Sequence, residues 1–310
     1  MKKEIGSEFW DIPLSNDENL IFSKETKWLL SGRTALDLII KDSGIKSVSM
    51  PRWCCESMIK PFTKNGVLVT FYDERPNFEC DAIFLIDYFG FADSNVSLAG
   101  YKGIVIRDVT HSIFSKKYND ADYYFGSLRK WAGFITGGFA WGKWKKQIDL
   151  LPYDNEYVTL RKKAMNLKSY YINGLINNKG FLDLFKQAND YLDFCGLCSA
   201  YDADIYAAKH FDVTKVKSIR RKNAKILVDR MGCIFELKDN DCPLFVPIKV
   251  EKRDALRKFL INNDVYLPIH WANYDLNGKE LSLVCDQRYD ESDMIRICDL
   301  IDSFYEKEGN

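Results

Sequence analysis

The strongest strand signal in this chain is Ala82-Ile-Phe-Leu-Ile86, a continuous apolar run that stops at Asp87. A second run, Ile104-Val-Ile106, stops at Arg107 and Asp108 in the same way. Strands of a parallel sheet have this pattern, because helices cover both faces of the sheet. Further strand candidates lie at 47–50, 67–72, 123–125 and 134–141, with helical or loop segments between them. The pattern predicts an α/β unit with a mostly parallel sheet.

The second half of the chain has a different organisation. Residues 145–232 are helical and polar, and they include a long amphipathic pattern over 209–229. Short strands are predicted within 242–250, 265–269 and 281–285, and helices are predicted around 256–260 and after Asp290. The last helix carries one apolar stripe, formed by Met294, Ile297, Cys298, Ile301 and Phe304. We therefore expect a large domain over 1–205 and a small α+β domain over 206–310.

Composition excludes several classes of protein. The 310 residues carry 44 Lys plus Arg and 44 Asp plus Glu, so the formal charge is zero. A protein that binds nucleic-acid phosphates or an anionic membrane surface would need an excess of basic residues. No apolar run approaches the roughly 18 residues of a membrane span. Nine cysteines, with no second pair or histidines near Cys195-Gly-Leu-Cys198, favour a reducing cytoplasm and no metal site.

Two residues near the ends of predicted strands are candidates for a chemical role. Asp108 closes an apolar strand, and Lys130 follows the next strand among apolar residues such as Trp131. Each has an ordinary explanation when taken alone. Asp108 fits a solvated loop residue that caps the next turn, and Lys130 fits a side chain that extends to water. A lysine in apolar surroundings also suits Schiff-base chemistry through a lowered pKa.

The combination resembles a known signature. An aspartate at a strand end, then Ser127-Leu-Arg-Lys130, then Gly137-Gly138, resembles fold-type I pyridoxal-phosphate enzymes. Ser31-Gly-Arg-Thr-Ala-Leu36 resembles the phosphate-binding helix start of the DegT/DnrJ/StrS-type sugar aminotransferases. Segments 50–62, 108–112, 220–224, 268–271 and 281–289 also look familial, so the resemblance covers about residues 29–301. It implies a three-layer α/β/α large domain and a small α+β C-terminal domain.

The resemblance also implies how pyridoxal 5′-phosphate would be held. Lys130 would supply the amine for its aldehyde and later carry a proton as general acid–base. Asp108 would pair with the pyridine nitrogen and raise its pKa. The backbone N–H groups of Thr34 and Ala35, at a helix N-terminus, and the Ser127 hydroxyl would bind the phosphate.

Four further residues are candidates by position. His111 matches the place of a hydrogen-bond donor to the ring's phenol oxygen. Trp53 is the expected stacking partner of the ring, although the family often places its aromatic residue where this chain has Cys55, and core packing is the alternative for Trp53. His270 and Arg288 are candidates for binding substrate. Arg288 would hold the donor's carboxylate, and a structural salt bridge is equally compatible with its position.

The family therefore suggests an aminotransferase. It would move an amino group from an amino acid, glutamate or glutamine, to the keto group of a nucleotide-linked sugar in surface-polysaccharide or secondary-metabolite biosynthesis. Relatives that replace the lysine with histidine perform dehydration, so Lys130 favours transamination. We also expect a cytoplasmic homodimer with active sites at the interface and no nucleic-acid or membrane partner. The alternatives are a pyridoxal-phosphate enzyme acting on a small ketone or amino alcohol, a lyase or dehydratase, and a non-catalytic regulatory protein on the same fold.

Overall fold

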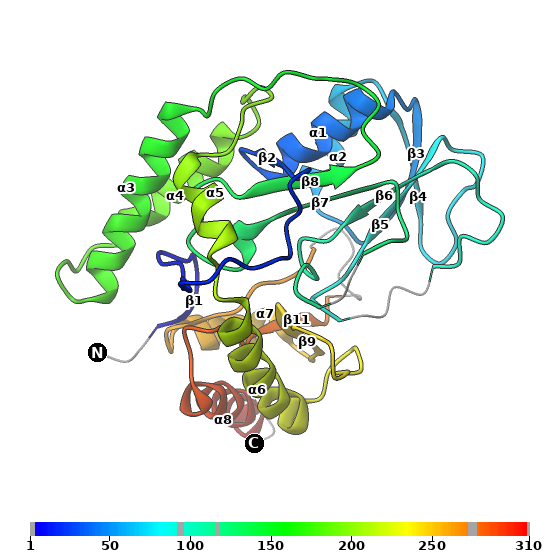
Figure 1. Cartoon of the computed structure of the whole chain (residues 1–310). Coiled ribbons are helices and arrows are strands. Elements are labelled where there is room, and N and C mark those ends of the chain that lie inside the picture. Colours follow the sequence, from blue (N-terminus) through cyan, green and yellow to red (C-terminus); the bar gives the residue numbers. More distant parts are fainter. Residues whose placement is uncertain (1–3, 92–95, 116–117, 272–277, 309–310) are drawn as a thin grey trace.

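The structure of the chain is a computed structural model, which describes residues 4–91, 96–115, 118–271 and 278–308 (Figure 1). Its centre is a seven-stranded sheet. In spatial order the strands are β2 (Lys27–Leu29), β8 (Gly138–Gly142), β7 (Tyr123–Ser127), β6 (Ile104–Asp108), β5 (Ala82–Ile86), β3 (Ser47–Pro51) and β4 (Leu68–Tyr72). Only β8 runs antiparallel to its neighbours. The predicted mostly parallel sheet is confirmed.

Helices and loops cover both faces of this sheet. Alternate residues of β5 pack against α1 (Gly32–Ser43) and α2 (Glu56–Lys64), while Ile83 and Leu85 face the other side. On that other side, residues 109–114 and 128–134 pack with α5 (Asp202–Lys209) and the start of α6 (Val213–Met231). Burial on both faces explains why the β5 sequence is apolar without alternation.

Two long helices extend from one end of the sheet. α3 (Asn155–Ile172) begins at Asp154, whose side chain accepts a hydrogen bond from the Tyr157 N–H. α4 (Phe181–Tyr191) packs antiparallel against it, at the left of Figure 1. None of the helices in the described ranges combines the length and apolar character that crossing a membrane requires.

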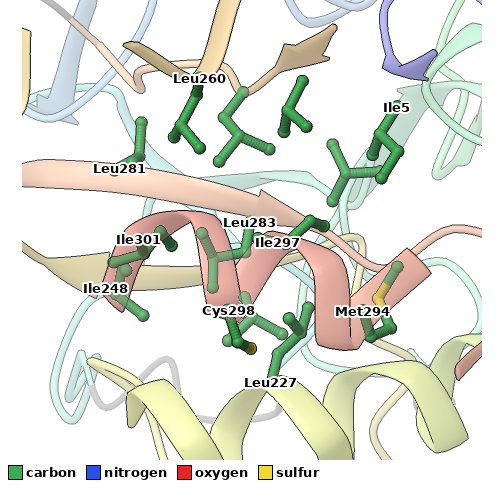
Figure 2. Packing of buried hydrophobic residues seen from close by; sticks show 14 of the residues in the cluster. Ile5, Leu227, Ile248, Leu260, Leu281, Leu283, Met294, Ile297, Cys298 and Ile301 are labelled. Carbon is green, nitrogen blue, oxygen red and sulfur yellow. The ribbon is translucent and has the colours of Figure 1, made fainter. Parts of the chain in front are cut away.

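The C-terminal part has its own apolar cluster, shown in Figure 2. β9 (Phe245–Lys249) pairs antiparallel with β11 (Glu280–Val284), and α6, α7 (Arg253–Ile261) and α8 (Glu291–Glu308) pack around this pair. Asp290 accepts hydrogen bonds from the N–H groups of Ser292 and Asp293, as an N-cap does. The domain boundary at 205/206 stays a prediction.

The N-terminal segment joins this C-terminal cluster. β1 (Ile5–Gly6) pairs in parallel with β10 (Val265–Tyr266), and Ile5 is fully buried in the cluster. Gly6 has φ +93°, and a Cβ there would lie 2.1 Å from the Tyr266 carbonyl oxygen, so only glycine fits. Strands β1 and β2 were not predicted, because two or three residues are too few to establish a period.

Candidate active site

The carboxyl ends of β6 and β7 lie side by side at one edge of the sheet, where they line a cavity of about 300 Å³. We call it the strand-end cavity. It brings together four of the predicted site residues from the sheet, Asp108, His111, Ser127 and Lys130, and one from the C-terminal part, His270. The other lining residues are Gly32, Arg33, Leu36, Cys55, Ser57, Met58, Thr110, Phe125, Arg129, Asn189 and Trp271.

Asp108 ends β6 with its side chain buried. Its Oδ1 accepts a hydrogen bond of 2.8 Å from the Thr110 N–H, but its Oδ2 has no partner. Burial raises the pKa of Asp108 to about 6, and the nearby charge of Asp87 adds to this effect. A buried carboxylate oxygen without a partner is unusual, and here it borders a cavity. The geometry suits a ligand that donates a proton or a hydrogen bond to Asp108.

His111 is also buried, and its hydrogen bonds define its tautomer. The Phe89 N–H donates to His111 Nδ1 at 3.3 Å. Burial, and then the charges of His270 and Lys130, hold the pKa of His111 well below its ordinary value. The ring is therefore neutral, with its remaining proton on Nε2, which makes Nε2–H a hydrogen-bond donor.

Lys130 is positioned by the turn that follows β7. Leu128–Lys130 form a short 3₁₀ helix, and the Leu128 N–H donates to the Gly137 carbonyl at 2.8 Å. The next residue, Trp131, is fully buried, and its Nε1 donates to the Thr110 carbonyl at 2.7 Å. Trp131 thus points into the core while the Lys130 side chain extends into the cavity.

The environment of Lys130 lowers the pKa of its amine. Its pKa lies below the ordinary lysine value because surrounding protein displaces water and because Arg129 is close. Within the described ranges, no side chain pairs with the amine at salt-bridge or hydrogen-bond distance. Ser127, three residues earlier, is buried and its Oγ has no partner. One cavity is therefore lined by an amine without a hydrogen-bond partner and by two residues with buried oxygen atoms that lack hydrogen bonds.

The start of α1 forms the wall next to Ser127, in a way that differs from the expectation for Thr34 and Ala35. The Thr34 N–H is bonded to Ser31 Oγ at 3.2 Å, and the Ala35 N–H to the Ser31 carbonyl at 2.9 Å. Neither residue lines the cavity, whereas Gly32 and Arg33 do. By helix geometry, the N–H groups of Gly32 and Arg33 lack intrahelical partners. An anion at this wall would therefore meet those two N–H groups beside Ser127.

Trp53 does not line the cavity. Its Nε1 donates to the His270 carbonyl at 2.8 Å, and its ring stacks on Tyr88 with centroids 4.8 Å apart. These contacts match the packing alternative for Trp53. Trp271 does line the cavity, and its ring lies nearly parallel to His111, at 5.9 Å and 19°.

The two substrate candidates differ in their freedom to bind. His270 borders the cavity, and burial lowers its pKa to about 3, so it is neutral. Arg288 lies outside this cavity and is engaged in four hydrogen bonds. Its Nε and Nη2 contact both Asp286 oxygens at 2.9 and 2.8 Å, and its Nη groups donate to the carbonyls of Ser7 and Glu8. The structure thus places Arg288 in the salt bridge that was the alternative to a substrate role.

Several lining residues were not among the predicted site residues, and Gly32, Arg129 and Asn189 are three of them. Arg129 directly precedes Lys130, and Gly32 begins a helix after Ser31. Their positions in the sequence could therefore have indicated that both residues line the site. Asn189 belongs to α4, which has no marked sequence signature.

Comparison with solved structures identifies the architecture. A DegT/DnrJ/EryC1/StrS aminotransferase from Brucella abortus superposes with a TM-score of 0.61 at 16% identity, over 90% of this chain and 85% of that one. The fold is that of the DegT/DnrJ/EryC1/StrS aminotransferases. Spr1654 of Streptococcus pneumoniae, described as a sugar aminotransferase and solved in its PLP form, gives 0.59 at 13% identity, over 91% and 87%. DesI, solved with its TDP-sugar product, gives 0.61 at 12%, over 89% and 79%. No protein-family model and no curated protein matches this chain.

Proposed function

We propose that this protein is a pyridoxal-phosphate-dependent aminotransferase that transfers an amino group from glutamate or glutamine to a keto group of a nucleotide-linked sugar. One observation carries the proposal. The strand-end cavity is lined by Lys130 and by two residues that each have a buried oxygen atom without a partner, Asp108 Oδ2 and Ser127 Oγ. The printed names of the Brucella abortus, Streptococcus pneumoniae and DesI structures support the reaction class, and the TDP-sugar product of DesI supports the acceptor class.

The residues of the cavity fit this cofactor. Asp108 Oδ2 is a free acceptor for a protonated pyridine nitrogen, and His111 Nε2–H is a donor for the phenol oxygen. Ser127 Oγ and the N–H groups of Gly32 and Arg33 are donors for the phosphate, which needs no basic surface when it binds at a helix N-terminus. When bound, pyridoxal phosphate supplies an aldehyde that condenses with amines and a ring that draws electrons from the substrate's α-carbon.

The charges of the residues around the cofactor site also suit the proposed reaction. The lowered pKa of Lys130 increases the share of unprotonated amine, which is the form that acts as a nucleophile and as a base. The pKa of Asp108 is raised to about 6 because its carboxyl is buried and Oδ2 has no partner. A cationic partner at Oδ2 would lower this pKa, so Asp108 would then be ionised. Neutral His111 and His270 add no positive charge near the amine.

We also propose that the protein acts as a homodimer. Large apolar side chains are exposed on adjoining segments at one side of the molecule, with Leu151 at 57% and Phe194 at 85%. Leu151 contacts the Gly196 position and bonds to the Leu197 carbonyl, so the two segments are neighbours. Exposed apolar patches commonly mark interfaces. Light scattering at micromolar concentration should give twice the 36.0 kDa chain mass, and a monomer would reject the dimer.

Absorbance spectroscopy tests the proposed reaction. Purified protein is titrated with pyridoxal phosphate and the visible band of the lysine-bound cofactor is followed. Glutamate, and separately glutamine, is then added, and the band should convert to that of the pyridoxamine form. A nucleotide-linked keto sugar should reverse the change. Absence of the visible band would reject the cofactor, and a band that neither amino acid converts would reject transamination.

A further inference from the structure

A second cavity, of about 350 Å³, opens on the other side of Lys130. It shares only Arg129 and Lys130 with the strand-end cavity. Its remaining walls come from the N-terminal residues 6–9, from α6 and α7, and from residues 244–245, 266–268 and 284–288. We call it the arginine cavity. Lys130 therefore stands at the junction of two separate spaces.

The arginine cavity has an excess of positive charge. Four arginines line it, namely Arg129, Arg220, Arg257 and Arg288, against two carboxylates, Glu8 and Asp286, so 4 − 2 leaves a charge of +2 before the Lys130 amine is counted. Both carboxylates are already paired. Asp286 Oδ2 lies 2.8 Å from Arg288 Nη2, and Glu8 Oε2 lies 2.9 Å from Nη2 of Arg161, which is outside the lining.

Arg220 is the most unusual member of this set. It is fully buried on α6, and its guanidinium lies over the Trp131 ring at 4.7 Å. Nε donates to Gln287 Oε1 at 2.9 Å, and Nη1 donates to the Leu244 carbonyl at 3.0 Å. Nη2 has no partner. These partners are neutral, and no carboxylate of the described residues lies within ion-pair distance of Arg220.

Arg129 shows the same incomplete bonding. Its Nη1 donates to the Tyr157 hydroxyl at 2.8 Å, and its buried Nε has no partner. Asp286 and Glu8 are close enough to interact electrostatically with Arg220 and Arg129, respectively, but each of these carboxylates forms its ion pair with another arginine. A buried N–H group without a hydrogen-bond partner is costly. Two guanidinium groups with such an N–H that line one cavity indicate an anionic ligand, and the guanidinium fork matches a carboxylate.

We propose that the arginine cavity binds a carboxylate of a dicarboxylic amino donor, with Arg220 and Arg129 as its ligands. The inference rests on the proposed function, because it names the donor of that reaction. The size of the cavity supports this ligand. Its volume of about 350 Å³ is near the lower end of the range of roughly 300–1,000 Å³ for small-molecule sites. A cavity of this size suits an amino acid rather than a nucleotide-linked sugar. Arg288, which Asp286 neutralises, closes the cavity against residues 7 and 8.

Calorimetry with glutarate tests this site independently of catalysis, because glutarate has two carboxylates and no amine to react. Titrations compare the wild type with Arg220→Met and Arg129→Gln. Lys222→Gln is the control, since it removes one positive charge from an exposed position on the same helix. We expect each arginine variant to bind glutarate at least about tenfold more weakly, as loss of a charged hydrogen bond implies, and the control to match the wild type. Two variants are used in case Arg220→Met does not fold.

The outcomes separate the two proposals. Equal glutarate affinity in wild type and in a folded arginine variant would overturn the carboxylate site, as would binding of inorganic phosphate in preference to glutarate. A raised KM for glutamate with an unchanged visible cofactor band would support the site. Absence of that band, with glutarate binding that still depends on Arg220, would reject the proposed function but support the carboxylate site.

Discussion

Asp108 ends strand β6, and Asp87 follows the last residue of the adjacent strand β5, yet the surroundings of the two aspartates are opposite. Asp87 is saturated with partners: Arg107 Nη1 donates at 2.6 Å and Ser112 Oγ at 2.9 Å. Asp108, equally buried, keeps one oxygen without a partner, and that oxygen borders a cavity. The comparison teaches that unmet hydrogen bonding, rather than position at a strand end, distinguishes the aspartate proposed to bind the cofactor from its neighbour.

The largest effect is expected at the structural aspartate. Asp87→Ala leaves Arg107, whose side chain is 5% exposed, without its buried partner, and breaking such a pair costs about 3–5 kcal/mol. Chemical denaturation should show this loss in the free energy of unfolding. Asp120 provides the control, because it contacts the same arginine but is 52% exposed. Asp120→Asn should cost less than about 1 kcal/mol, and equal losses in both variants would contradict the structural role of Asp87.

Asp108→Asn should have its main effect on catalysis. The amide cannot stabilise a protonated pyridine nitrogen as a carboxylate does, and loss of one such preorganised charge lowers kcat by about 10²–10³-fold. Single-turnover conversion of the cofactor by glutamate measures this. Activity within a factor of two of the wild type would remove Asp108 from the proposed site.

The same substitution should stabilise the cofactor-free protein at neutral pH. The folded-state pKa of about 6 exceeds the ordinary 3.8, so ionisation of Asp108 opposes folding. The penalty is absent below about pH 4, develops as the pH rises to about 6, and reaches roughly 3 kcal/mol above it. Asp108→Asn removes it, so the gain in stability should appear at pH 8 and vanish at pH 4. A variant that is less stable at pH 8 would show that the carboxylate is satisfied in the folded protein.

The smallest effect concerns two serines that extend the comparison. Ser127 Oγ has no partner, whereas Ser112 Oγ bonds to Asp87. Ser127→Ala should weaken pyridoxal-phosphate affinity by about 1.5 kcal/mol, roughly tenfold, and leave the cofactor-free stability within about 1 kcal/mol. Ser112→Ala should lower stability by about 1 kcal/mol without changing affinity. A reversed pattern, measured by calorimetric titration and thermal unfolding, would contradict the distinction.

The sequence was sufficient to predict the sheet and the residues at its edge. Apolar runs that end in polar residues placed Asp108, Ser127 and Lys130 near one another, since the ends of parallel strands share one edge. The sequence did not predict which backbone N–H groups of α1 are available to a ligand, because this depends on local hydrogen bonds. Ser31 uses the N–H groups of Thr34 and Ala35, which leaves the helix end to Gly32 and Arg33.

Contacts between distant segments were also beyond sequence reasoning. Asp286 binds Arg288 in a salt bridge, and the Trp53 indole N–H donates to the His270 carbonyl, and the sequence predicts neither contact. The arginine cavity gathers Arg129 and Arg220 from separate helical elements. Only packing of the C-terminal part against the sheet brings these two residues together, and no local pattern encodes it.

The central claim is that Lys130 is the amine that binds the cofactor aldehyde. Borohydride reduction of the protein mixed with pyridoxal phosphate, followed by peptide mass spectrometry, tests it most directly. We predict one pyridoxyl group per chain on Lys130, and none on that peptide in Lys130→Ala. A modified lysine elsewhere, or no modified lysine at all, would contradict the account.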